Sequence, residues 1–96
     1  MNKLMELHPR GAVVVCEHVA ELRYPILRGK RDEPDFPEDT GWQFLCNRHS
    51  PERRPLFWAL EEVIAYEPSL ADFADCPPGT ELVRPGQGED WIVTGC

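Results

Sequence analysis

The placement of proline constrains the fold of this chain more than any other sequence feature. Ten of the 96 residues are proline, a residue that fixes its own φ angle and lacks the N–H that helices and central strands need. The prolines share one property, which is that they lie at the boundaries of the hydrophobic patterns. Among them are Pro25, Pro34, Pro37, Pro51, Pro55, Pro68, Pro77 and Pro78. They divide the chain into short elements, and 96 residues can bury only one hydrophobic core.

The N-terminal half predicts three strands. Residues 12–16 form a continuous, β-branched apolar run of the kind that is buried on both faces of a sheet. Residues 17–21 either extend this strand or turn away from it. Residues 26–31 form a second strand, and residues 41–46 form a third with a period of two.

The third strand carries the predicted structural residues. Gly41 opens it, and the alternation places Trp42 and Phe44 in the core. Asp39 is suited to cap the turn before Gly41. We expect substitutions at Gly41, Trp42 and Phe44 to act on the fold.

The C-terminal half predicts a helix, a second short helical turn and a hairpin. Residues 56–67 have apolar positions at helical spacing and end at a proline, and Ser69 is placed to cap the next helical turn. Residues 81–84 and 90–94 form two strands joined by a Pro-Gly turn. The order predicts an α+β fold with an antiparallel or mixed sheet of about five strands, one main helix and a short second helix packed on one face. Residues 1–10 are expected to be a loose leader, and residues 11–96 a single domain.

The charge of the chain restricts its partners. Ten basic against 17 acidic side chains give a net charge of −7, which argues against nucleic acid and against an anionic membrane. The charge fits a basic protein partner, and it equally fits solubility alone. No segment has the length and apolarity of a signal peptide or a membrane span, so we expect a cytoplasmic protein.

The acids between the second and third strands are the first candidate binding residues. A proline-stiffened loop holds them close together, which favours a pre-organised recognition surface over an ordinary solvated loop. They are Asp32, Glu33, Asp35, Glu38 and Asp39. A basic patch follows at Arg48, Arg53 and Arg54.

Trp58 is the second candidate. At helical spacing it falls on the polar side of the predicted helix, beside Glu61 and Glu62. A tryptophan in such a position either anchors a protein partner or is covered by another part of the chain. The sequence leaves both alternatives open.

The cysteines and histidines allow a metal or thiol site. Cys16, His18, Cys46 and His49 provide two sulfurs and two imidazoles, but their spacing is not that of a zinc finger or ribbon. We therefore expect Cys16 and Cys46 to be buried thiols inside strands and Cys96 to be exposed. Without a secretion signal the protein is expected to fold with neither a disulfide nor a metal. No phosphate-binding glycine loop or catalytic triad is present, so no enzymatic activity and no cofactor are predicted.

Several motifs together resemble one bacterial protein family. They are Arg31-Asp32-Glu33-Pro34, Asp39-Thr40-Gly41-Trp42-Gln43-Phe44, Tyr66-Glu67-Pro68-Ser69-Leu70, and Pro77-Pro78-Gly79-Thr80 with Leu82 and Arg84. The chain resembles, over roughly residues 11–84, the immunity-protein family numbered thirty-three of polymorphic toxin systems, formerly a domain of unknown function. It departs from that family after the aromatic strand, where members often have an acidic, glycine-containing segment and this chain has a basic one.

The resemblance implies a non-enzymatic immunity protein that neutralises a cognate toxin by binding it. It supplies no catalytic residues and no cofactor. The acidic loop then predicts a toxin with a basic site. Two alternatives remain: a small metal- or thiol-dependent enzyme or regulator that uses Cys16, His18, Cys46 and His49, and a stand-alone binding domain unrelated to toxins.

Overall fold

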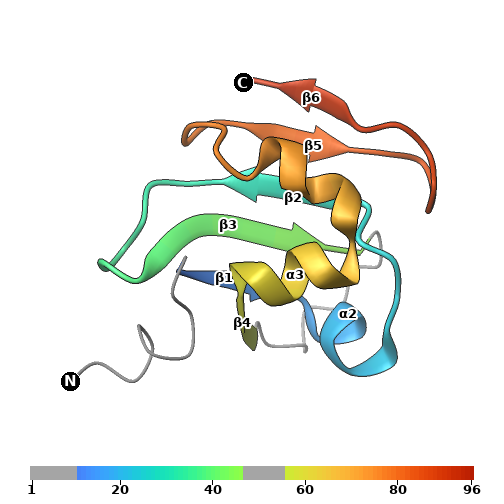
Figure 1. The fold of residues 1–96 in the computed structure, drawn as a ribbon, viewed down its shortest axis with the longest axis horizontal. Helices are drawn as coiled ribbons and strands as arrows, with labels where there is room; N and C mark the ends of the chain where they lie inside the picture. The colour runs from blue at the N-terminus through green and yellow to red at the C-terminus, as the bar shows by residue number, and fades with distance from the viewer. Residues whose placement is uncertain (1–10, 47–55) are drawn as a thin grey trace.

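Six strands form one mixed sheet in the part of the chain that the computed structural model describes, residues 11–46 and 56–96. The strands are β1 (Ala12–Val15), β2 (Arg28–Arg31), β3 (Asp39–Leu45), β4 (Leu56–Ala59), β5 (Glu81–Val83) and β6 (Ile92–Thr94). Their order across the sheet is β4-β1-β3-β2-β5-β6 (Figure 1). The expected leader (residues 1–10) and the basic patch of Arg48, Arg53 and Arg54 lie outside the described residues.

The sheet is mixed because β1 and β3 run parallel. Every other neighbouring pair is antiparallel: β1 with β4, β2 with β3, β2 with β5, and β5 with β6. The predicted α+β class with a mixed sheet is confirmed, with one strand more than the five expected.

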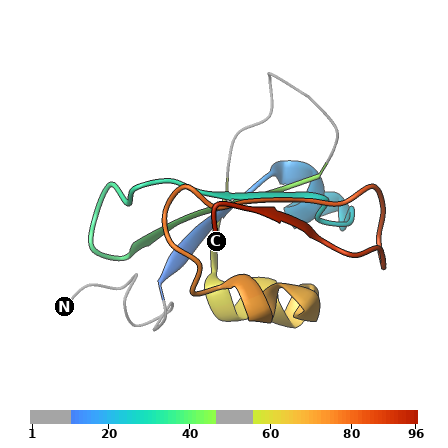
Figure 2. The ribbon, with the colours of Figure 1, turned by 90° about the horizontal axis from the view of Figure 1, so that it is seen from above.

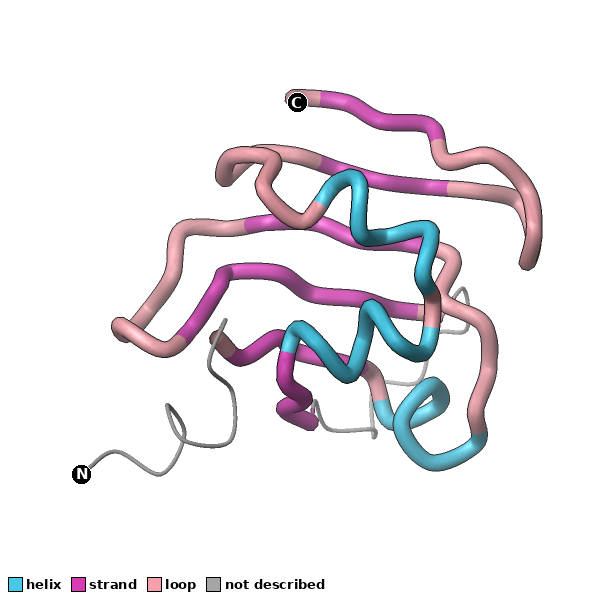
Figure 3. The backbone as a smooth tube through the Cα atoms, viewed as in Figure 1, coloured by secondary structure: helices cyan, strands magenta, loops and turns pink. Residues whose placement is uncertain are grey.

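Two helices cover one side of the sheet. The α-helix α3 (Leu60–Tyr66) and the 3-10 helix η1 (Pro68–Phe73) lie together on that side (Figure 2). A further short helix, α2 (Glu17–Leu22), follows β1 at the end of the sheet opposite the β2–β3 loop (Figure 3). Helices on one face were predicted, but α2 was not.

The aromatic strand β3 lies at the centre of the core, as predicted. Trp42 and Phe44 are 0% and 2% exposed, and their rings stack with centroids 5.2 Å apart. The indole Nε1 of Trp42 donates a hydrogen bond to the carbonyl of Ala74 at 3.0 Å. This bond ties β3 to the segment that follows η1, and it satisfies the one polar group of a fully buried side chain.

The helix predicted for residues 56–67 is wrong in its first turn. Leu56 to Ala59 form β4 and pair with all four residues of β1, with Ala59 opposite Ala12. A short apolar run suits either a helix or a strand, and here the backbone hydrogen bonds to β1 decide the outcome. Ser69 is also not the predicted cap, because the N-cap position of η1 is Glu67.

The expectation of no disulfide is contradicted as well. Cys76 and Cys96 are disulfide-bonded, with their Cα atoms 5.3 Å apart and a sequence separation of 20. Pairing of β6 with β5 brings the end of the chain back beside the turn after η1, where the Thr80 hydroxyl donates to the Gly95 carbonyl at 3.4 Å. Cys96 is exposed, as expected, but its sulfur is in the disulfide and is not a free thiol.

Candidate functional site

The β2–β3 loop is shaped by the side chain of Asp39. Its carboxylate accepts hydrogen bonds from the backbone N–H of Asp35 at 3.0 Å and of Gly41 at 2.8 Å. The predicted cap is therefore confirmed. Gly41 has φ +84°, and a Cβ there would collide with the carbonyl oxygen of Asp32, so only glycine fits this position without strain.

This loop encloses one side of an open hollow of about 190 Å³, which we call the acidic hollow. Its lining residues are Asp32, Glu33, Asp35, Asp39, Val14, Phe36, Gly41, Trp42, Gln43 and Phe57. Phe36 and Phe57 meet edge to face with ring centroids 6.2 Å apart, and Phe57 is 51% exposed. The hollow thus combines carboxylates with an accessible aromatic surface.

The predicted acids of the loop differ in how many hydrogen bonds and ion pairs their carboxylates make within the protein. Asp32 accepts a hydrogen bond from Gln43 Nε2 at 2.7 Å and forms an ion pair with Lys30 at 3.7 Å. Asp39 is engaged by backbone N–H groups. Glu33 and Asp35 are exposed, and within the described residues neither carboxylate has an ion pair. These two are therefore the carboxylates of the loop whose charge is least engaged within the protein.

Glu38 does not line the acidic hollow. It is half-buried directly before β3, where its carbonyl accepts a hydrogen bond from the Ala12 N–H at 2.7 Å. Its predicted part in partner binding therefore has no support from its position.

Trp58 lies in β4, so its predicted position on the polar side of a helix is wrong. It is half-buried, with Tyr66 edge to face at 5.7 Å and the guanidinium of Arg23 over its ring at 5.4 Å. With Glu62 these three residues line a separate, open hollow of about 470 Å³, which we call the aromatic hollow. Of the two alternatives for Trp58, the contacts with Arg23 and Tyr66 favour the covered side chain.

The two helical acids are also separate from the acidic hollow. The carboxylate of Glu62 accepts the Ala59 N–H at 3.0 Å and so caps the start of α3. One carboxylate oxygen of Glu61 is buried and has no hydrogen-bond partner among the described residues. The predicted binding set is thus divided: one part lines the acidic hollow, and Trp58 and Glu62 line the aromatic hollow.

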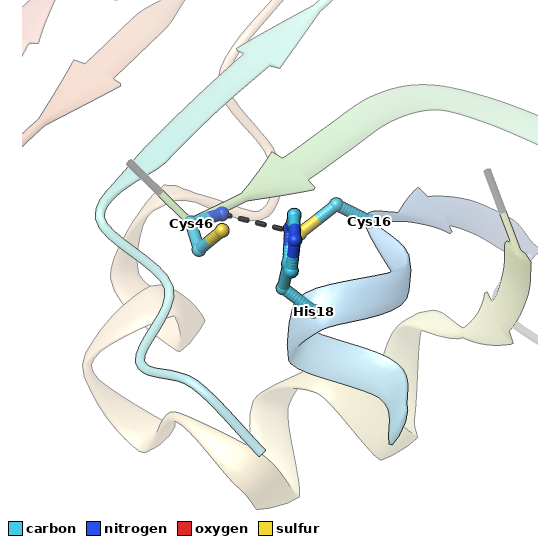
Figure 4. A group of neighbouring side chains, drawn as sticks. All are labelled: Cys16, His18 and Cys46. Carbon is cyan, nitrogen blue, oxygen red and sulfur yellow. Dashed lines mark hydrogen bonds between the residues drawn. The ribbon is translucent and has the colours of Figure 1, made fainter. Parts of the chain in front are cut away.

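Three of the four predicted metal or thiol residues come together, and we call them the thiol cluster. One donor atom from each of Cys16, His18 and Cys46 lies within 4.8 Å of the other two (Figure 4). The backbone N–H of Cys46 donates to the Cys16 sulfur at 3.3 Å. Neither cysteine is in a disulfide. His49 lies outside the described residues.

The parallel pairing of β1 with β3 creates the thiol cluster. Cys16 and Cys46 each follow directly after one of these strands, and the Cys16 N–H donates to the Phe44 carbonyl at 3.3 Å. Helix α2 then begins at Glu17 and carries His18 back toward the two sulfurs. Cys46 is buried, as predicted, whereas Cys16 is only half-buried, and both lie just past the strands rather than inside them.

The two phenylalanines of the acidic hollow, Phe36 and Phe57, were not predicted from the sequence, and neither were Val14 and Gln43. Phe36 lies within the acidic loop itself, so its position among acidic residues in the sequence could have indicated it as a binding residue. Phe57 had no such signal, because its segment was assigned to a helix.

Comparison of the chain with protein-family models, curated proteins and solved structures finds no match. The resemblance to the immunity-protein family therefore stays a prediction from the sequence motifs. In residues 11–46 and 56–96, no helix has the length and apolar character required to cross a bilayer.

Proposed function

We propose that this chain is a non-enzymatic binding protein that neutralises a bacterial toxin by covering a basic site with its acidic hollow. One observation carries the proposal: Glu33 and Asp35 lie exposed, with no ion pair among the described residues, around a hollow that also presents Phe57. The motif resemblance suggests a toxin as the partner, and the exposed carboxylates around the hollow support it as the proposed binding surface.

The chemistry of the acidic hollow suits a cationic protein surface. An accessible aromatic ring with carboxylates around it can accept the apolar stem of an arginine or lysine and pair with its charged head. The net charge of −7 adds long-range attraction to a basic partner. Backbone hydrogen bonds to Asp39 hold the loop before binding, so less ordering is needed when the partner arrives.

The cellular compartment is part of the proposal. We propose the cytoplasm, where Cys76 and Cys96 would be held as thiols by the reducing pool. Alkylation inside living cells, followed by mass spectrometry, tests this assignment. Alkylation of both Cys76 and Cys96 supports the cytoplasm, and an intact Cys76–Cys96 bond would place the protein in an oxidising compartment instead.

The experiment that tests the function is growth rescue. Each protein encoded beside the gene for this chain is expressed from an inducible promoter, with and without this chain. We expect one neighbour to arrest growth alone and to be tolerated, and co-purified, when this chain is present. If no neighbour is toxic, or if the chain rescues none, the proposal is wrong.

A charge-matched pair of variants shows whether the acidic hollow is the surface used. Glu33→Gln with Asp35→Asn removes two exposed charges from the hollow and should abolish rescue. Asp72→Asn with Asp75→Asn removes two exposed charges at and just after η1, outside the hollow, and should leave rescue intact. Equal rescue by both double variants would contradict the assignment of this surface.

A further inference from the structure

We propose that Cys16, His18 and Cys46 form a Zn²⁺ site with three protein ligands and an open fourth position. This inference goes beyond the proposed function. It rests on one juxtaposition: two sulfurs and one imidazole nitrogen within 4.8 Å of one another at the end of a parallel strand pair.

The donor types are those that Zn²⁺ prefers. Cysteine sulfur and histidine nitrogen are its usual protein ligands, and two cysteines with one histidine form the set found in zinc sites that keep one position for an external ligand. Two thiolates also balance the charge of the ion, which matters because Cys46 and His18 are 6% and 8% exposed. A buried cation without such compensation would be strongly disfavoured.

The geometry is close to that of a bound site. Zn–S bonds of about 2.3 Å in a tetrahedron separate two sulfurs by about 3.8 Å. Two sulfurs within 4.8 Å of one another therefore need to approach by at most about 1 Å, and a sulfur and the imidazole nitrogen by at most about 1.3 Å. Rotation of the cysteine side chains can supply a movement of this size without changing the backbone.

Surrounding contacts already orient the ligands. The Cys46 N–H donates a hydrogen bond to the Cys16 sulfur at 3.3 Å, which holds this sulfur close to Cys46. The His18 ring is stacked on Tyr24, with centroids 5.7 Å apart and planes 5° apart, so its plane is set by packing. Cys16 is half-buried, so the cluster is more open to solvent at this residue than at His18 or Cys46, which are buried.

The site is separate from the acidic hollow. Asp39 begins β3 and Cys46 follows its last residue, so the seven-residue strand places them about 20 Å apart. A bound ion would link the start of α2 to the end of β3, and Zn²⁺ bound only by the folded state stabilises that state. The zinc experiment can therefore fail without affecting the growth-rescue result, and the reverse also holds.

The test is metal binding by the full chain under nitrogen, after treatment with a chelator. Co²⁺ serves as the spectroscopic probe. We expect a thiolate-to-cobalt charge-transfer band in the near ultraviolet and intense visible bands of four-coordinate Co²⁺, all removed by one equivalent of Zn²⁺. Absence of the charge-transfer band would overturn the proposal.

Variants then assign the ligands. Cys16→Ser, His18→Gln and Cys46→Ser should each weaken Zn²⁺ binding by at least about 100-fold, because even substitutions outside the ligand set cost about 10–100-fold. Cys76→Ser with Cys96→Ser removes the other two cysteines and should leave the affinity unchanged. Equal affinity in all these variants would show that the ion binds elsewhere and would contradict the site.

A second measurement covers the case in which a ligand variant does not fold. In the wild-type chain, Zn²⁺ should protect Cys16 and Cys46 from alkylation, as read by mass spectrometry of the peptides. If Zn²⁺ leaves both cysteines reactive, or if they form a disulfide with each other in place of binding the ion, the proposal is wrong.

Discussion

Arg84 and Glu67 form an ion pair at 2.8 Å in which the side chains are only 1% and 15% exposed. The Arg84 Nε also donates to the Ile26 carbonyl at 3.0 Å, and the guanidinium lies 4.4 Å from the centre of the Trp91 ring. One arginine thus joins the helical layer, the chain before β2 and the β5–β6 hairpin. Such a group is costly to disturb, because removing one partner leaves the other buried charge uncompensated.

Replacing Arg84 should therefore destabilise the protein strongly. We expect Arg84→Met to lower the free energy of unfolding by about 3–5 kcal/mol, measured by denaturant titration. Lys30→Met is the matched control, because the Lys30–Asp32 pair is 45% and 55% exposed and such pairs contribute about 0–1 kcal/mol. Similar losses in the two variants would contradict the role given to Arg84.

The same pair predicts how stability depends on pH. Burial raises the pKa of Glu67, but hydrogen bonds from Ser69 and Arg84 and the charge of Arg84 outweigh it, so the pKa is lowered overall. A carboxyl with a lowered pKa contributes its full stabilisation above the unfolded-state value of about 4.3 and loses it as the pH falls through the folded-state value. The measurement is the unfolding free energy across this acidic range. The unfolding free energy of the wild type should decrease as the pH is lowered, and that of Glu67→Gln should decrease less steeply.

Two tryptophans should respond differently to the same substitution. Trp42→Ala removes a side chain that is 0% exposed and leaves a cavity, at a cost of about 3–5 kcal/mol. Trp58→Ala removes a half-buried ring whose edge-to-face contact with Tyr66 contributes about 0.5–1.5 kcal/mol beyond its burial. Denaturant midpoints compare them, and an equal loss in both would show that Trp58 belongs to the core.

Reduction of the disulfide should also be measurable in the purified protein. The Cys76–Cys96 bond closes a loop with a sequence separation of 20, for which chain-entropy arguments give about 3 kcal/mol. We expect reductant to lower the thermal midpoint of the wild type and to leave that of Cys76→Ser with Cys96→Ser unchanged. A midpoint in the wild type that does not respond to reductant would contradict a stabilising bond.

The strands with a clear local pattern were predictable from sequence. Alternation in β3 placed Trp42 and Phe44 in the core, and the Pro-Gly turn indicated the β5–β6 hairpin. These features depend only on neighbouring residues. The same holds for Asp39, whose capping bonds reach residues only two and four positions away.

Features that depend on distant pairing were not predictable. Leu56 to Ala59 became β4 because β1 offered a partner, and six residues from Glu17 are too few to show a helical period. The proximity of Cys16 to Cys46 follows from the parallel pairing of β1 with β3, and that of Cys76 to Cys96 from the return of β6. Cysteine spacing alone carries no information on either pair.

The candidate binding residues were only partly predictable for the same reason. The acidic loop is local in sequence, so the grouping of Asp32, Glu33 and Asp35 could be expected. The division of the candidate residues between the two hollows could not be expected, because it depends on where β4 pairs in the sheet. Phe57 joins the acidic hollow and Trp58 the aromatic hollow because adjacent residues of a strand face opposite sides.

Association kinetics show whether the toxin is bound through the acidic hollow. The rate constant for binding to the toxin identified by growth rescue is measured from low to high salt, for wild type and for both charge-matched double variants. We expect Glu33→Gln with Asp35→Asn to slow association at least about tenfold at low salt and to flatten the salt dependence, because steering by exposed charges is screened over about 8 Å at physiological ionic strength. Asp72→Asn with Asp75→Asn should change the rate much less. A wild-type rate that is independent of salt and unchanged by neutralising Glu33 and Asp35 would contradict binding through the acidic hollow.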